Sequence, residues 1–117
     1  MKFFGPRKRE MLEDLLHQYK GSRVQLQETG GTLRFRGKLV EFGELDICGR
    51  ILLEAYLSLD FEGLHAHLTF HDELLGVQIL EDEKESDPNL ILALEVPYER
   101  LSIENLDQPR KEETSEK

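Results

Sequence analysis

The spacing of apolar residues along the chain changes near residue 22. Before it, apolar residues recur at the three- to four-residue spacing of one face of an α-helix, namely Met11, Leu12, Leu15, Leu16 and Tyr19. Pro6 suits the first turn of such a helix, and Gly21 suits the position just after its end. The sequence therefore predicts one amphipathic helix over about residues 6–20.

From Ser22 onward, apolar and polar residues alternate, which is the period of strands with one buried face. Gly30 and Gly31 separate the first two alternating segments and predict a tight hairpin. The alternation changes phase after Gly37, and a glycine inside a strand often marks an irregularity. We therefore expect a β-bulge or a bend near Gly37.

The alternation continues over residues 51–59 and 64–70, and further strands are expected over residues 74–80, 90–96 and 98–103. The charged run over residues 81–88 predicts a solvated loop, and residues 107–117 hold no hydrophobic residue of the kind that fills a core. The sequence therefore predicts a helix within residues 1–21, an antiparallel β domain over residues 22–106 and a disordered polar tail over residues 107–117.

The expected fold class is all-β, a small antiparallel barrel or sandwich of about seven strands, with one N-terminal α-helix that caps one end. A length of 117 residues fits a single domain. The longest apolar run, Leu90–Leu94, is far too short to span a membrane. One cysteine, Cys48, cannot form an intrachain disulfide, and no signal-peptide pattern opens the chain, so we expect a cytoplasmic protein.

Charge is distributed unevenly. The net charge is −9, from 15 basic and 24 acidic residues. Residues 1–40 hold nine basic and four acidic residues, whereas residues 41–117 hold six basic and twenty acidic ones. This asymmetry indicates a basic surface for a phosphate-bearing partner. The alternative is that the two halves interleave in one fold and neutralise each other.

The second alternating segment places three basic side chains on one strand face, at a spacing of about 6.6 Å: Arg34, Arg36 and Lys38. Together with Arg23, they are the candidate ligand- or nucleic-acid-binding residues, since such a row can follow a phosphate backbone. The alternative is that they are cross-strand partners of acids such as Glu28 or Glu54.

His65 and His67 share one face of a predicted strand. Two imidazoles at that spacing can bind zinc or another transition metal if a carboxylate completes the site. The alternative is an ordinary solvated face, in which case no cofactor is expected.

Residues 12–47 resemble the first motif of the Sm-like family of small barrels. The resemblance rests on Val24-x-Leu26, Gly31 and Phe35-x-Gly37-x-Leu39-x-x-Phe42. It implies a bent five-stranded barrel, assembly into rings and binding of RNA.

A fainter resemblance is to the PilZ domain, a barrel that binds cyclic di-GMP. Arg7, Lys8 and Arg9 stand for the arginine motif of that family, and Asp46-Ile47-Cys48 for part of its second motif. Cys48 stands where the family has serine, and Ile51 where it has glycine.

These patterns predict a non-enzymatic binding or adaptor module that contacts RNA or a nucleotide through its basic N-terminal half. A homo-oligomer or a protein partner is expected, and no membrane. The alternatives are a cyclic-dinucleotide domain, a metal-binding protein or enzyme that uses His65 and His67, and a structural domain whose open strand edges pair with another chain.

Overall fold

The N-terminal helix forms where the apolar spacing predicts it. The computed structural model describes residues 5–31, 33–81 and 89–107, and helix α1 spans Gly5–Tyr19. Leu12 and Leu16 are buried in the core. Gly21 follows the helix with a φ of 91°, a conformation that glycine adopts without strain. Met11, which the sequence places on the buried face, is exposed instead.

Seven antiparallel strands follow the helix and form one sheet. They are β1 (Arg23–Glu28), β2 (Arg34–Ile47), β3 (Arg50–Leu59), β4 (Leu64–Phe70), β5 (Leu74–Glu81), β6 (Asn89–Pro97) and β7 (Leu101–Asn105). Their order in the sheet is β6-β5-β4-β3-β2-β1-β7. The expected all-β fold with one N-terminal helix is confirmed.

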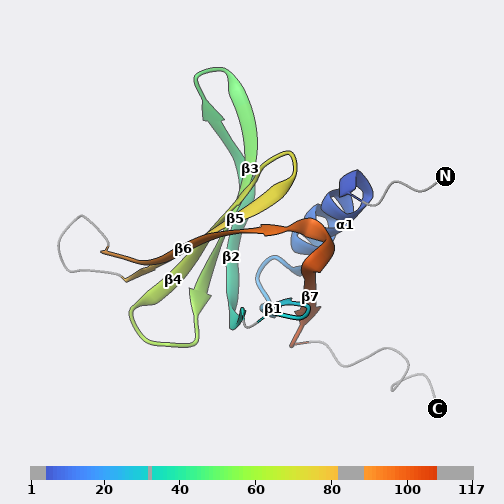
Figure 1. Ribbon diagram of the computed structural model, residues 1–117. Coiled ribbons are helices and arrows are strands. Elements are labelled where there is room, and N and C mark those ends of the chain that lie inside the picture. The colour runs from blue at the N-terminus through green and yellow to red at the C-terminus, as the bar shows by residue number, and fades with distance from the viewer. Residues whose placement is uncertain (1–4, 32, 82–88, 108–117) are drawn as a thin grey trace, which may run out of the picture.

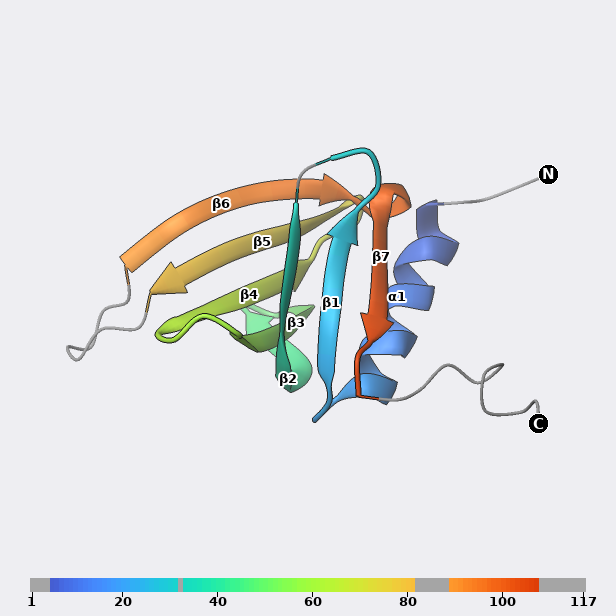
Figure 2. The same cartoon turned by 90° about the horizontal axis from the view of Figure 1, so that it is seen from below.

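The sheet curls because its last strand returns to its first. β6 leads through the short 3-10 turn η1 (Tyr98–Arg100) directly into β7, which pairs with β1. The result is a half-barrel from which the long β2–β3 hairpin projects (Figure 1). Helix α1 lies alongside β7 (Figure 2) and also contacts β2 and η1. The sequence predicts a strand that begins at Tyr98, but its first three residues form η1 instead.

The core lies on the concave face of the sheet, where alternate residues of most strands and two residues of α1 meet. Its most completely buried side chains are Leu16, Leu26, Leu39, Leu57, Leu68, Leu75, Leu101, Val24, Val77 and Val96. Because side chains alternate between the two faces of a strand, burial of these residues places their polar neighbours on the convex face.

The irregularity expected near Gly37 is present in β2, at Val40 rather than at Gly37 itself. The register shifts between Leu39 and Glu41, so Val40 is the extra residue and its side chain is exposed. Gly37 stays in register with Leu59, and a Cβ there would lie only 2.6 Å from the carbonyl oxygen of Ser58. Gly37 therefore serves the close approach of β2 to β3.

The turn of the β2–β3 hairpin contains Cys48. Cys48 and Gly49 have φ values of 51° and 85°, as both central residues of a type I′ turn require. The Asp46 carboxylate accepts a hydrogen bond of 2.9 Å from the Gly49 N–H. Cys48 is exposed, in this turn. The expected solvated loop, apart from Glu81, and the polar tail beyond Asp107 lie outside the described residues.

Candidate basic binding face

The convex face of β1 and β2 brings together all four basic residues that the sequence singles out. Cross-strand register pairs Arg23 with Lys38, Gln25 with Arg36, and Gln27 with Arg34. Directly paired residues point to the same side of a sheet. Arg23, Arg34, Arg36 and Lys38 therefore share one surface, which we call the basic face.

A chain of amide hydrogen bonds holds the middle of the basic face. Arg36 Nε donates to Gln25 Oε1 at 2.7 Å, and Gln25 Nε2 donates to Gln27 Oε1 at 3.2 Å. Gln25 is only 9% exposed, although it lies opposite the core-facing side of β1. These hydrogen bonds hold the guanidinium of Arg36 in one orientation.

Glu28 and Glu54, the acids that the sequence offers as partners of the row, are engaged elsewhere. Glu28 forms an ion pair of 3.4 Å with Arg100, and Glu54 contacts His67 at 2.7 Å. Among the described residues, Arg34 and Lys38 have no ion-pair partner. The proposed cross-strand pairing of the row with Glu28 or Glu54 is therefore wrong.

Two basic residues of the N-terminal half form ion pairs with acids from later in the chain. Arg23 Nη2 lies 2.6 Å from Asp60 Oδ2, and Arg9 Nη1 lies 3.6 Å from Asp72 Oδ1. Glu104 of β7 is in register with Gln25 and places an acid beside the row. Interleaving of the two halves thus accounts for Arg9 and Arg23, and it leaves Arg34 and Lys38 unneutralised.

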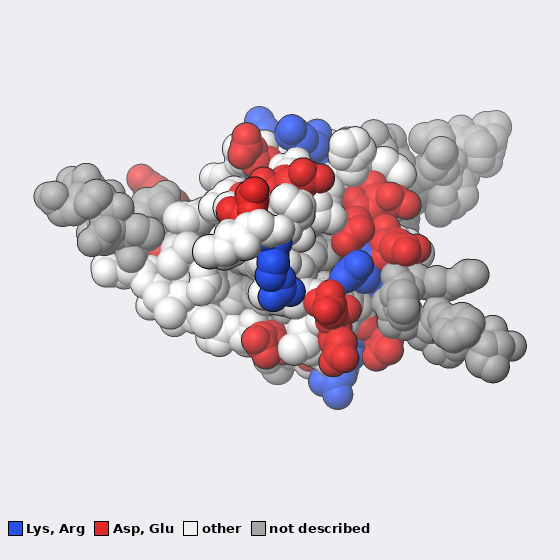
Figure 3. Space-filling view, turned by 90° about the horizontal axis from the view of Figure 1, so that it is seen from above, with Lys and Arg blue, Asp and Glu red and all other residues white. Residues whose placement is uncertain are grey.

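The same mixing is visible on the side seen in Figure 3. There, Asp and Glu side chains lie close to the Lys and Arg side chains. The charge asymmetry along the sequence therefore does not separate the two signs on this side of the molecule.

An aromatic cluster lies on the convex face next to the basic face. Tyr56 of β3 stacks on His67 of β4, with ring centroids 4.5 Å apart and planes inclined by 7°. Tyr56 is two residues along β3 from Ser58, which is paired with Lys38. Burial, followed by the charges of Glu54 and Glu41, raises the pKa of the Tyr56 phenol, which stays protonated at neutral pH.

His65 and His67 lie on the same face, as the sequence predicts. His67 Nε2 is bound to Glu54, and the ring of His65 lies 6.4 Å from that of Tyr56. The part of the chain that the structure describes contains no group of three or more His, Cys, Asp or Glu side chains placed to hold a metal ion. His67 and Glu54 are here a hydrogen-bonded pair, and metal binding by the two histidines stays a prediction.

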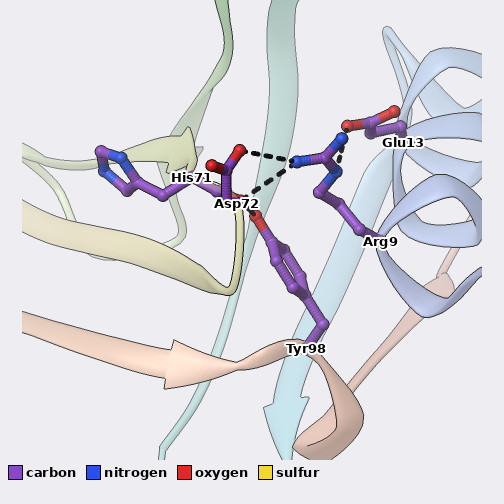
Figure 4. A network of polar contacts seen from close by, with 5 residues as sticks. All are labelled: Arg9, Glu13, His71, Asp72 and Tyr98. Atoms are coloured by element: carbon purple, nitrogen blue, oxygen red, sulfur yellow. Dashed lines mark hydrogen bonds and ion pairs between the residues drawn. The ribbon is translucent and has the colours of Figure 1, made fainter. Parts of the chain in front are cut away.

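Arg9, one of the residues that resemble the PilZ arginine motif, is part of a different network (Figure 4). Its Nε lies 3.4 Å from Glu13 Oε2, and its Nη1 reaches both Asp72 and the carbonyl oxygen of His71. The Tyr98 hydroxyl donates to the same carbonyl. Burial raises the pKa of Tyr98 to about 12.

A cleft of about 680 Å³ lies beside this network. Asp72, Glu73 and Glu99 line it together with Arg9, so acids outnumber the single guanidinium. Asp46, from the second PilZ-like segment, caps the β2–β3 turn instead. Binding of a cyclic dinucleotide through these segments stays a prediction.

Comparison of the chain with protein-family models, with curated proteins and with solved structures finds no match. The resemblances to Sm-like and PilZ proteins therefore stay predictions. Within the described residues, no helix is long and apolar enough to cross a membrane.

The sequence predicts the basic row but not the glutamine side chains that hold Arg36 in place. Gln25 and Gln27 alternate with Val24 and Leu26 on β1. This alternation was the signal that two amide side chains share one face of β1, where they can form hydrogen bonds beside the basic row. Tyr56 comes to the same convex face from a strand whose register no local pattern specifies.

Proposed function

We propose that this chain is a non-enzymatic binding module that holds single-stranded RNA on its basic face. The observation that carries the proposal is the pair of unneutralised cations, Arg34 and Lys38, in a chain with a net charge of −9. Acidic residues outnumber basic ones in this protein, and yet Arg34 and Lys38 have no ion-pair partner among the described residues. Such a pair of cations is available to an anion from outside the chain.

The length of the row favours a polyanion over an isolated phosphate. Arg34 and Lys38 are four residues apart on β2, which is about 13 Å in an extended strand. A ligand must carry more than one phosphate to contact both ends at once. Between them, Arg36 uses Nε for Gln25, and its two Nη groups carry four further N–H donors in the fork geometry that suits phosphate.

The acidic surroundings of the row shape the expected specificity. Asp60 and Glu104 flank it at Arg23 and Gln25, so the basic face is narrow. A narrow cationic strip attracts a flexible single strand more readily than a duplex, whose second strand would face the acids. Phosphate contacts also make binding weaken as salt rises, by about 0.7 log units per log unit of salt for each phosphate engaged.

The test is fluorescence anisotropy of a labelled single-stranded RNA, titrated with the protein at several salt concentrations. The variant is Arg34→Glu combined with Lys38→Glu, which spares Arg36 and its bond to Gln25. The matched control is Lys20→Glu combined with Arg50→Glu. Both replaced residues of the control are exposed and lie off the basic face, and both double variants change the net charge equally.

We expect the first variant to lose at least about tenfold in affinity and to flatten the salt slope by about 1.4, the value for two phosphate contacts on a single strand. The control is expected to stay within about threefold of the unmodified chain. Absence of binding by the unmodified protein at low salt, or an equal loss in both variants, would refute the proposal.

A further inference from the structure

Among the strands that the structure describes, β6 lies at one edge of the sheet. It pairs with β5, and no other described strand pairs with it. At the opposite end of the sheet, β7 has helix α1 alongside it (Figure 2). An unpaired edge presents a row of backbone N–H and C=O groups that can pair with another strand.

The side chains of β6 are apolar where an edge strand usually carries charge. Leu90, Ile91 and Leu92 are 56%, 54% and 43% exposed. No charged residue occurs from Asn89 to Leu94. Proteins commonly guard exposed edges with Lys, Pro or a bulge, and β6 has only the bulge at Ile91 and Pro97 at its end. Exposed apolar groups of this kind mark interaction surfaces.

We infer that β6 pairs antiparallel with β6 of a second copy of this chain. A two-fold interface places each residue of the patch against the same patch of the partner, so the patch must tolerate its own charges. The only charged residue of β6 is Glu95. With the two-fold axis near Leu92, the two Glu95 residues lie about 20 Å apart, six residues of strand rise, and do not oppose each other.

Because each copy carries a large negative charge, dimerisation is expected to depend on salt in the opposite sense to RNA binding. Two copies of net charge −9 repel each other at long range, and salt screens that repulsion. Dimerisation through an apolar edge therefore strengthens as salt rises, whereas binding of RNA weakens. The inference is independent of the proposed function, and either can fail alone.

The test is sedimentation velocity of the full chain from about 10 μM to about 1 mM, at low and high salt. We expect a concentration-dependent dimer that is more populated at high salt. Ile91→Lys, which places a charge on the edge, should weaken the dimer at least tenfold. Ile51→Lys on the β2–β3 hairpin is the control, because Ile51 is equally exposed at 55% and lies on another part of the sheet. Urea midpoints establish that both variants fold.

Hydrogen exchange of the unmodified chain provides a second readout that needs no variant. Amides of β6 that face away from β5 should gain protection as concentration rises. A chain that stays monomeric at about 1 mM, or a dimer that Ile91→Lys leaves intact, would overturn the inference. Protection of those amides in the monomer would overturn it too, because another segment of the same chain would then cover the edge.

Discussion

Replacing Gly37 by alanine tests whether β2 and β3 approach too closely for a side chain. An alanine Cβ would lie 2.6 Å from the Ser58 carbonyl oxygen and 2.9 Å from Leu59 Cα, and ordinary contact begins at 3.4 Å. Both neighbours belong to backbone, so the strands must separate by about 0.8 Å. Overpacking of this kind lowers the free energy of unfolding by about 1–3 kcal/mol. Alanine also restricts the unfolded chain more than glycine does, which raises the free energy of unfolding by about 0.4–1 kcal/mol. We expect a net loss of about 1–2 kcal/mol.

Urea unfolding measures this loss directly. With a slope of about 1–3 kcal/mol per molar urea, the midpoint should fall by roughly 0.3–2 M. Gly43→Ala is the matched control, since Gly43 lies in the same strand and nothing approaches its added Cβ within 4 Å. That variant should be more stable than the unmodified chain by about 0.4–1 kcal/mol. Equal midpoints for the two variants would refute the close approach.

Two further substitutions have effects of known sign. Cys48→Asn should stabilise the fold by about 0.5–1 kcal/mol, because asparagine adopts a positive φ more readily and Asn-Gly favours the type I′ turn; an unchanged or lower urea midpoint would contradict the turn geometry. Tyr98 has a folded-state pKa of about 12 against an ordinary value of 10. Folding therefore opposes its ionisation, and the stability that depends on the neutral phenol is complete below pH 10 and declines up to about pH 12. Tyr98→Phe removes this decline, and urea midpoints over that pH range should fall less steeply for the variant than for the unmodified chain.

Local patterns predicted most of the fold because they depend on neighbours within a few residues. The helical spacing of Leu12 and Leu16 and the alternation around Leu57 each identify an element and its buried face. The position of the bulge could not be found that way, because it depends on which residue of β3 opposes Val40. The change of phase after Gly37 was real, but sequence alone could not place it three residues later.

The same distinction applies to the candidate site, where features within one strand could be predicted and contacts between distant segments could not. Arg34, Arg36 and Lys38 share a face through the two-residue period of one strand, and the hairpin brings Arg23 beside them. The sequence does not show that Arg34 and Lys38 lack an ion-pair partner, since this depends on two contacts between distant segments. Glu54 of β3 contacts His67 of β4, and Glu28 contacts Arg100, which lies beyond β6. Such contacts follow from register between distant segments.

The return of β7 to β1 also constrains how the chain folds. Val24 pairs with Asn105, a closure of roughly 80 residues, whereas every other strand pair joins neighbours in the chain. Contacts between distant residues form late, since the entropy of closing the loop is lost before they can contribute. We expect the meander from β1 to β6 to assemble first and β7 to dock last. During synthesis, β1 therefore cannot pair with β7 until nearly the whole described chain has left the ribosome.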